Sequence, residues 1–345
     1  MKLMKRIIVT GGTGYIGSHT SVELINAGFE VVILDNLSNS NIEVLNGIKK
    51  ITGIKPEFHN VDLAKIEETR KVLAKLKNIV GIIHFAAYKA VGESVRYPLK
   101  YYKNNLNSLM NILEAMQEFK INNLIFSSSC TVYGQPKKLP VTEKSPIIKA
   151  DSPYGNTKQI SEEIISDTIS SFGKFNAISL RYFNPVGAHE SAEIGELPIG
   201  VPDNLVPYIT QTAAGIREQL NIFGNNYNTP DGTAVRDYIH VSDLAKAHIV
   251  ALNRLLNKQN TRRTEIFNIG TGKGNSVLEI VKTFEKVTGI KLNYTITDRR
   301  PGDIEKIWAN VNLAEKELKW KTEKSIADAL LSAWNWEKKY RGINK

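Results

Sequence analysis

Short apolar runs without polar alternation recur through the first half of the chain, and helical patterns separate them. The runs are RIIVT (6–10), EVVILD (30–35), EFHNVD (57–62), VGIIHF (80–85), NLIFSSS (123–129) and NAISLRYF (176–183). The helical patterns lie near 15–27, 65–77, 98–119 and 153–171. Continuously apolar strands that alternate with helices are typical of a parallel sheet covered on both faces. The pattern predicts a doubly wound α/β (Rossmann) domain.

The pattern changes near residue 183. Residues 184–235 are rich in Pro, Gly and Asn and contain one clear helical pattern, near 204–219. Later segments are again regular: helices near 241–256, 276–288 and 325–340, and a strand EIFNIG at 265–270. The strand and the helix before it predict a return to the parallel sheet.

Two domains follow from this change. We expect a Rossmann domain over 1–183, rejoined by about 237–270, and a smaller C-terminal α/β domain over 184–345. A chain of 345 residues is long enough for both.

The charge balance does not require a nucleic-acid partner. The net charge is +10, but basic residues are mixed with acids, as in KIEETRKVLAKLK, which is typical of solvated helix faces. The densest clusters, TRR (261–263) and DRRPGD (298–303), are too short for a nucleic-acid-binding arm. An anionic small substrate suits the positive balance equally well.

The cysteine content and hydropathy point to a cytoplasmic protein without a membrane segment. Cys130 is the sole cysteine, which excludes an intramolecular disulfide and any cysteine-cluster metal site, and we expect no metal. No apolar run approaches the ~18 residues of a membrane span. The start, MKLMKRIIVTGG, predicts a first strand rather than a signal peptide.

A glycine-rich loop follows the first strand in TGGTGYIGSH. Gly11, Gly14 and Gly17 lie between a strand and a helix, where glycine permits positive φ and close backbone approach. The helix N-terminus then offers free N–H groups and the positive end of its dipole to a diphosphate. A tight strand–helix turn without a ligand is the alternative.

The end of the second strand favours NAD as the cofactor. Asp35 follows Gly17 by 18 residues and can accept hydrogen bonds from an adenosine ribose. It would repel a 2′-phosphate, and DNLSNSN (35–41) contains no Arg or Lys to neutralise one. NAD is therefore predicted rather than NADP.

The G-x-x-G-x-x-G spacing resembles that of the extended short-chain dehydrogenases/reductases. VDL (61–63) fits an adenine-side contact in that family, and HFAAYKA (84–90) fits the strand that passes behind the cofactor. Asp62 could equally be the N-cap of the helix that follows.

Two segments set a Tyr four residues before a Lys. In YGQPK, Pro136 separates Tyr133 from Lys137 and disfavours a helix, so this pair is interpreted as chance plus a turn. In SPYGNTK, Ser152 and Pro153 start a helix, and Tyr154 and Lys158 then lie one turn apart on one side.

The second pair can work as a base. A free Tyr has a pKa of ~10, and an adjacent ammonium and a positively charged nicotinamide both favour its phenolate. The phenolate can take a proton from a sugar hydroxyl as hydride leaves the same carbon. Lys158 can also hold the nicotinamide ribose, and Ser129, at the end of NLIFSSS, can hydrogen-bond the same substrate oxygen. The alternative is a helix-start Tyr with a solvated Lys.

A set of motifs in one order resembles the UDP-galactose (UDP-glucose) 4-epimerase family over nearly the whole chain. The motifs are TGGTGYIGSH, FAAYKAVGES, YYKNN, FSSSCTVYG, SPYGNTK, RYFNPVGAH, VRDYIHVSDLA and RRPGD. The resemblance implies a tightly held NAD that is not consumed, with Tyr154 as base and hydride passing from C4 of the hexose and back to the opposite face of a 4-keto sugar. It also implies a homodimer.

The site expected from the motifs and the resemblance has two parts. Cofactor contacts are expected from Gly11, Gly14, Tyr15, Ile16, Gly17, Asp35, Asn36, Leu37, Ser38, Asn39, Ser40, Asp62, Leu63, Phe85, Ala86, Ala87, Lys89, Asn104, Ser129, Tyr154, Lys158 and Phe183. UDP-sugar contacts are expected from Lys89, Ser129, Tyr154, Phe183, Asn184, Asn204, Leu205, Phe223, Arg236, Tyr238, Arg300, Asp303 and Ile307. Guanidinium groups suit the diphosphate, and Asp303 and Asn204 suit uridine or ribose hydroxyls.

Ile307 departs from a common form of the family pattern. The residue before Trp308 walls the sugar pocket in the family, and many bacterial members carry a Tyr there. A smaller wall could admit an N-acetyl group at C2, so UDP-GlcNAc and UDP-GalNAc are predicted as additional substrates.

Three other functions share the fold. A nucleotide-sugar 4,6-dehydratase needs an Asp-Glu pair where this chain has Cys130 and Thr131, which disfavours dehydration. A UDP-uronic acid 4-epimerase could differ by one pocket residue. A non-catalytic NAD-binding regulatory protein could lose the tyrosine, and the intact Ser129, Tyr154 and Lys158 argue against it.

Overall fold

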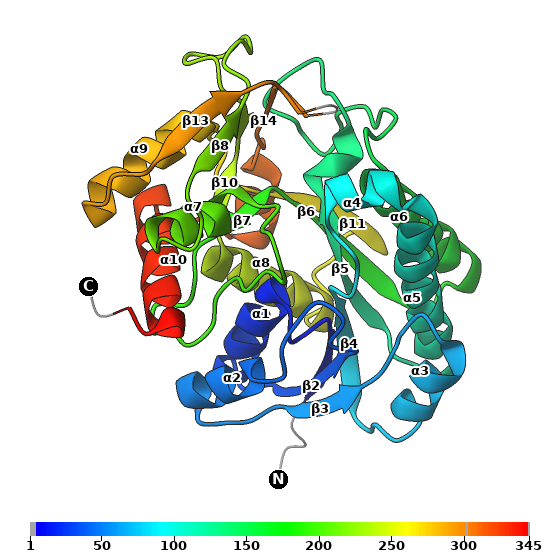
Figure 1. Cartoon of the computed structure of the whole chain (residues 1–345). Helices are drawn as coiled ribbons and strands as arrows, with labels where there is room; N and C mark the ends of the chain where they lie inside the picture. The colour runs from blue at the N-terminus through cyan, green and yellow to red at the C-terminus, as the bar shows by residue number, and fades with distance from the viewer. Residues whose placement is uncertain (1–4, 301–302, 344–345) are drawn as a thin grey trace.

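Seven parallel strands form the central sheet of the computed structural model (Figure 1), which describes residues 5–300 and 303–343. In spatial order they are β11 (Thr264–Ile269), β6 (Asn176–Tyr182), β5 (Asn123–Ser129), β4 (Ile79–His84), β1 (Arg6–Thr10), β2 (Glu30–Asp35) and β3 (Glu57–Asn60). Every neighbouring pair is parallel. Most of their apolar residues are buried, and on both faces, which is why the runs lack polar alternation.

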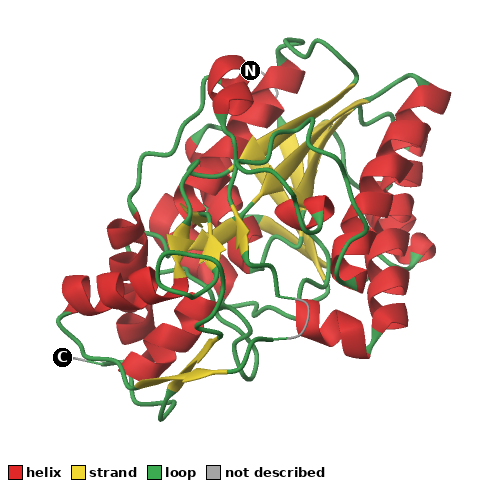
Figure 2. Ribbon diagram, turned by 90° about the horizontal axis from the view of Figure 1, so that it is seen from above, coloured by secondary structure: helices red, strands yellow, loops and turns green. Residues whose placement is uncertain are grey.

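Helices cover both faces of the sheet (Figure 2). One face carries α1 (Tyr15–Asn26), α2 (Val44–Thr52) and α8 (Val241–Leu256), whose apolar side chains share a buried cluster with β1 and β2. The other face carries α3 (Ile66–Leu73), α5 (Pro98–Glu118) and α6 (Pro153–Phe172) over a second cluster. This layering is a doubly wound α/β fold.

The strand order reverses direction at the carboxyl ends of β1 and β4. The chain runs from β1 outward through β2 and β3, then crosses to β4 and continues the other way. Ligands of doubly wound folds bind at this reversal point. The glycine loop and the segment after β4 both start there, so the fold brings two predicted cofactor segments together.

A smaller unit packs beside the sheet on its own core. The helices α7 (Leu205–Ala213), α9 (Val277–Thr288) and α10 (Ile326–Arg341) enclose the apolar cluster with β8 (Leu220–Phe223). Its remaining strands are β7 (Asn184–Val186), β9 (Val235–Arg236), β10 (Tyr238–His240), β12 (Asn275–Ser276), β13 (Tyr294–Thr297) and β14 (Lys306–Ile307). They form sheets β10-β7, β12-β9-β14 and β13-β8.

The predicted fold class is confirmed, and the strands expected in the first half all occur. The strand expected at 265–270 is β11, which pairs with β6 at one edge of the sheet. The helix expected at 204–219 is shorter, because α7 ends at Ala213 and Gly215 follows with a φ of 72°. The division into two domains, with the boundary near 183, stays a prediction.

Several short elements were not expected from the sequence. They are α2, α4 (Val91–Arg96), the 3-10 turn η1 (Cys130–Tyr133), the π-helical turn η2 (Ala314–Leu318) and the small strands of the second unit. The alternative in which Asp62 is a helix N-cap is wrong. Lys65 is the N-cap of α3, and the Asp62 carboxylate accepts the Ala64 N–H (3.0 Å) in the turn before it.

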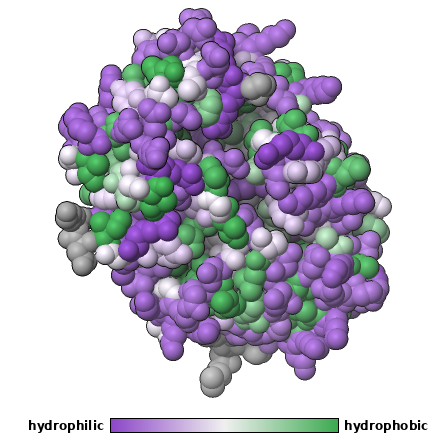
Figure 3. Space-filling view, in the orientation of Figure 1, coloured by the Kyte–Doolittle hydropathy of each residue, from purple (hydrophilic) through white to green (hydrophobic). Residues whose placement is uncertain are grey.

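Hydrophilic residues dominate the face shown in Figure 3. Among the helices in the described part of the chain, none is long and apolar enough to cross a membrane. Within residues 5–300 and 303–343, no group of three or more His, Cys, Asp or Glu side chains is placed to hold a metal ion.

Candidate active site

The glycine loop leaves no room for side chains. Gly11 has a φ of 66°, and a Cβ there would lie 2.9 Å from the backbone N of Ala86 after β4. A Cβ on Gly17 would lie 2.3 Å from the Gly11 carbonyl oxygen. Gly14 is the N-cap of α1 and makes no side-chain capping hydrogen bond. The loop is therefore a bare backbone cradle at a helix N-terminus, which suits a diphosphate.

Asp35 connects the end of β2 to this loop. Its carboxylate accepts the backbone N–H groups of Thr13 (3.2 Å) and Leu37 (2.9 Å) and the hydroxyl of Ser40 (3.2 Å). These contacts hold a negative charge beside the glycine loop, and no basic residue occurs between Asp35 and Lys49. The residues fit an NAD ribose and oppose a 2′-phosphate.

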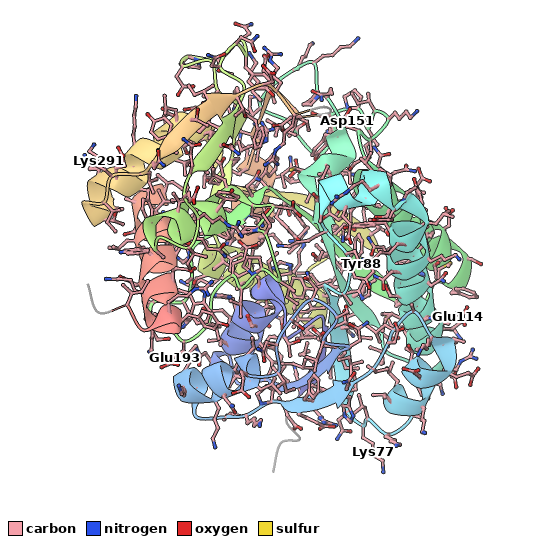
Figure 4. All side chains as sticks on the ribbon, in the orientation of Figure 1. Lys77, Tyr88, Glu114, Asp151, Glu193 and Lys291 are labelled. Carbon is pink, nitrogen blue, oxygen red and sulfur yellow. The ribbon has the colours of Figure 1, made fainter. Side chains whose placement is uncertain are left out.

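The segment after β4 is fixed by hydrogen bonds to its neighbours. The Ala86 N–H donates to the Thr10 hydroxyl (3.3 Å). The N–H of Tyr88, labelled in Figure 4, donates to the Asn105 side-chain oxygen (2.8 Å). The Asn105 amide donates in turn to the Thr157 hydroxyl (3.2 Å) on α6. Asn105 was not predicted, although it adjoins the predicted Asn104, and it connects the cofactor segment to the Tyr154 helix.

Ser129, Tyr154 and Lys158 meet at the carboxyl end of β5. Ser152 caps α6 by accepting the Gly155 N–H (3.1 Å), and Pro153 is its first residue, as predicted. All three predicted catalytic side chains are buried, with exposures of 6%, 8% and 5% respectively. The Lys158 Nζ donates to the Ser127 carbonyl (2.6 Å) and lies 6.0 Å from the centre of the Tyr154 ring.

Burial decides the charge states of this pair. It raises the pKa of the Tyr154 phenol well above its ordinary value, with a further increase from Tyr182, and a hydrogen bond with Ser129 offsets part of this. Burial lowers the pKa of the Lys158 ammonium to about 8, against an opposing effect of Glu162. The sequence led us to expect a lowered tyrosine pKa. The Lys158 ammonium donates to the Ser127 carbonyl rather than to the Tyr154 hydroxyl. The effect of burial on the phenol therefore outweighs any stabilisation of the phenolate by Lys158.

The other Tyr–Lys pair, Tyr133 and Lys137, does not form a catalytic arrangement. Tyr133 ends η1 and is fully buried, and its hydroxyl donates to Asn268 (2.6 Å) and accepts from Arg181 (3.1 Å). Lys137 lies in the loop that follows. The interpretation of YGQPK as chance plus a turn agrees with these contacts.

The predicted diphosphate residues face partners of their own. Arg236 on β9 pairs with Asp303 (2.5 Å), and the Arg300 guanidinium lies 4.0 Å from the centre of the Phe223 ring. All four were predicted as UDP-sugar contacts, so the structure brings them together in pairs. The other guanidinium nitrogen of Arg236 donates to the Val235 carbonyl (2.9 Å), so the side chain is held in place by its own strand and by Asp303.

Ile307 lies beside the predicted site residues rather than on the surface. It pairs with Arg236 between β14 and β9 and shares a buried cluster with Val132, Tyr133 and Phe183. Its neighbours face outward: Lys306 and Trp308 line a cavity of about 510 Å³. The full lining is Gln135, Pro136, Lys137, Leu139, Glu305, Lys306 and Trp308, and includes none of the predicted site residues.

Glu196 is a residue that the sequence did not reveal. Its carboxylate accepts from the Lys89 ammonium (2.9 Å) and from the Asn204 amide (2.6 Å). Lys89 was predicted to contact both the cofactor and the sugar nucleotide, and Asn204 was predicted to contact the sugar nucleotide. Glu196 therefore connects the two halves of the predicted site, and no motif in the sequence marks it.

Asn184 and Tyr238, both predicted substrate contacts, lie opposite each other in the β7–β10 pair. Tyr238 is buried, which raises the pKa of its phenol to about 12. Asn204 is the N-cap of α7 and Leu205 its first residue. The second unit thus presents its predicted contacts from strand ends and a helix start, which are rigid positions for ligand recognition.

The fold and the buried Ser–Tyr–Lys group beside a glycine loop define a short-chain dehydrogenase/reductase-like protein. A model of the GDP-mannose 4,6 dehydratase family matches residues 8–332. The UDP-glucose 4-epimerase of Bacillus subtilis is 50% identical over 331 residues, which cover 96% of each chain.

Solved structures agree with this match. The UDP-glucose 4-epimerase of Stenotrophomonas maltophila, with bound NAD and formylated UDP-arabinopyranose, superposes with a TM-score of 0.94 at 43% identity, over 98% of this chain and 99% of the other. That of Bifidobacterium longum, in complex with NAD+ and UDP, gives 0.94 at 44% over the same shares. The chain belongs to the UDP-glucose 4-epimerase family, within the extended short-chain dehydrogenases/reductases.

Proposed function

We propose that the chain is an NAD-dependent UDP-glucose 4-epimerase that interconverts UDP-glucose and UDP-galactose through a transient 4-keto sugar. The observation that carries the proposal is the buried meeting of Ser129, Tyr154 and Lys158 at the carboxyl end of β5, on the same edge of the sheet as the glycine loop after β1. One base and one hydride acceptor are enough for a reversible inversion at a carbinol carbon.

Each residue of this group has a distinct task. Tyr154 takes the proton of the C4 hydroxyl and later returns it, and the Ser129 hydroxyl bonds the same oxygen. Lys158 supplies a positive charge that favours the phenolate, because an ammonium near a buried phenol opposes the cost of its ionisation. Its pKa of about 8 keeps it charged at pH 7.

The cofactor is held by the loop and Asp35. When bound, NAD accepts a hydride from the substrate carbon and gives it back. The backbone at the start of α1 would hold its diphosphate, and Asp35 would accept hydrogen bonds from its adenosine ribose. The remaining predicted cofactor and UDP-sugar contacts are part of the same proposal.

The competing functions have less support. Dehydration needs an acid–base pair where Cys130 and Thr131 stand, and burial raises the pKa of the Cys130 thiol to about 12, so it is neutral at pH 7. A uronic-acid epimerase would need a cation at the sugar C6. The matched relatives named above carry UDP-glucose 4-epimerase in their names.

The function is tested by incubating the purified chain with UDP-glucose, UDP-GlcNAc and UDP-glucuronate separately, without added NAD. Formation of UDP-galactose is expected, because retained NAD is not consumed. Product from UDP-glucuronate alone would favour the uronic-acid alternative, and no product with any sugar, even with NAD supplied, would favour a regulatory protein.

We expect UDP-GlcNAc and UDP-GalNAc to be interconverted as well, because Ile307 leaves more room than a Tyr at this wall. Ile307→Tyr is expected to lower turnover of the N-acetylated pair at least tenfold more than turnover of UDP-glucose, since ~1.4 kcal/mol of steric cost is a tenfold effect. Turnover of UDP-glucose by the variant controls for folding. Absence of N-acetylhexosamine turnover by the unmodified chain would contradict this prediction.

We propose a homodimer, formed through α4 and the start of α5. Large apolar side chains are exposed there: Val95 (59%), Tyr97 (58%) and Leu99 (69%). Such exposure marks interaction surfaces. Leu99→Glu is expected to shift the particle from dimer to monomer in light scattering at micromolar concentration. Ile199→Glu, at another exposed apolar position (64%), is the matched control. A monomeric unmodified chain would refute the proposal.

A cytoplasmic location completes the proposal. The single cysteine supports it, because proteins of reducing compartments do not rely on disulfides. The substrate is a charged sugar nucleotide, and no nucleic acid or membrane is required.

A further inference from the structure

A buried ion pair connects α6, the helix that carries Tyr154 and Lys158, to strand β6. Glu162 follows Lys158 by one helical turn on α6, and its partner Arg181 is on β6. Their side chains are 8% and 2% exposed. Arg181 donates from Nε to Oε1 (2.9 Å) and from Nη2 to Oε2 (2.5 Å), and the Ser128 hydroxyl also donates to Oε1 (2.5 Å).

The end of β5 ties this pair to the catalytic residues. Three consecutive serines serve three partners: the Ser127 carbonyl accepts from Lys158, the Ser128 hydroxyl bonds Glu162, and Ser129 bonds Tyr154. A displacement of Glu162 therefore reaches Lys158 along α6 and through the strand.

Stability alone does not account for a charged pair at this place. Removing two charges from water costs several kcal/mol, and apolar replacements of buried ion pairs are often neutral or stabilising. The effect of the Glu162 charge on the nearby Lys158 ammonium is therefore the more informative property of the pair.

Glu162 is the one anionic side chain among the described groups that act on Lys158. The other neighbours are neutral or cationic. His84 on β4 is buried, which lowers its pKa to about 3, so it is uncharged at pH 7. Tyr182 on β6 is a phenol whose pKa burial raises to about 12. Phe126 on β5 presents its ring 4.8 Å from the Lys158 Nζ.

The far side of the pair is also defined. Arg181 contacts both Glu162 and the Tyr133 hydroxyl. The Glu162 carboxylate thus pairs with a permanent guanidinium cation, and one helical turn away on α6 lies an ammonium that burial tends to discharge.

We propose that Glu162, clamped by Arg181 and Ser128, is a positioning residue that keeps Lys158 protonated at neutral and mildly alkaline pH. It acts through Lys158 and does not touch the substrate. The catalytic use of the Lys158 charge rests on the proposed function, whereas the effect of Glu162 on the protonation of Lys158 does not.

The test follows the titration of Lys158 itself. The full chain is labelled with ¹³C at the lysine ε-carbons, the Lys158 signal is assigned by its loss in Lys158→Met, and chemical shift is recorded against pH. In Glu162→Gln the titration is expected to move down by about one pH unit, because an opposite charge nearby is worth at least that much. Glu163→Gln removes the same charge from the exposed neighbouring position and should change nothing.

The pH profile of kcat should move with the titration. A lysine with a lower pKa loses its charge as pH rises through that lower value. Glu162→Gln should therefore match the unmodified enzyme on the acid side and fall to about one tenth of it above both pKa values, a ratio set by the one-unit shift.

A second variant covers the case in which Glu162→Gln does not fold because it leaves Arg181 unpaired. Glu162→Gln combined with Arg181→Met removes both charges, and a smaller downward movement of the Lys158 titration is expected, because loss of the guanidinium cation favours the ammonium and offsets part of the effect. An unchanged Lys158 titration in a folded variant, with kcat lowered equally at every pH, would make the pair a structural brace and overturn the proposal. Failure of both variants to fold would do the same. A shifted titration in a chain that epimerises nothing would support the inference while refuting the function.

Discussion

Replacing Tyr154 with Phe is expected to lower kcat for UDP-glucose by about 10³-fold, within the range of general acid–base catalysis. The ring is expected to keep its place, because Tyr154 is only 8% exposed and the substitution removes only the hydroxyl. KM should change by less than about threefold, since the proposed substrate contacts of the second unit are untouched. Steady-state kinetics at pH 7–8 measures both constants.

A matched hydroxyl deletion separates chemistry from packing. The hydroxyl of Tyr102 on α5 accepts a hydrogen bond from Asn156 (2.7 Å), which lies on α6 as Tyr154 does. Tyr102→Phe removes that one hydrogen bond. It should cost about 1 kcal/mol of stability and leave kcat within about twofold. If Tyr154→Phe retained more than a tenth of the activity, the assignment of the base would be wrong.

Gly17→Ala is expected to damage both the fold and cofactor retention. The new Cβ would lie 2.3 Å from the Gly11 carbonyl oxygen and 2.9 Å from the Gly12 Cα, both backbone atoms that cannot rotate away. We expect the free energy of unfolding to fall by about 3 kcal/mol. NAD affinity should fall at least tenfold, because moving the loop sacrifices a charge-assisted hydrogen bond worth roughly 1.5–3 kcal/mol.

Gly92→Ala is the matched control. A Cβ there meets no atom within 4 Å, and Gly92 lies within α4. This substitution should be neutral or stabilise the chain by up to about 1 kcal/mol. Denaturant unfolding and the NAD content of the purified proteins measure the effects, and a Gly17→Ala protein with normal stability and NAD content would show that the loop is not a tight cradle.

The sheet could be predicted because its strands are buried on both faces. Val31, Val32, Ile33 and Leu34 are all buried, and a short, β-branched apolar run of this kind is typical of a strand covered on both faces. Ser129, Tyr154 and Lys158 could be predicted because local signals, the Ser152 cap and Pro153, fix the helix phase of two of them.

The features that could not be predicted depend on tertiary contacts. Gly47 interrupts the pattern of α2, and the structure explains it: a Cβ there would lie 2.6 Å from the Glu193 carbonyl oxygen, so glycine permits the helix to touch a distant loop. Glu196 and Glu162 are ordinary charged residues in the sequence. Only the fold places one between Lys89 and Asn204 and the other in a buried ion pair with Arg181.

The central claim is that C4 loses and regains its own hydrogen as hydride, while Tyr154 handles only the hydroxyl proton. UDP-glucose carrying deuterium at C4, converted in ordinary water, tests it most directly. The account predicts that the UDP-galactose formed keeps its deuterium at C4, as seen by mass spectrometry and NMR. Replacement of that deuterium by hydrogen from the solvent would contradict the account.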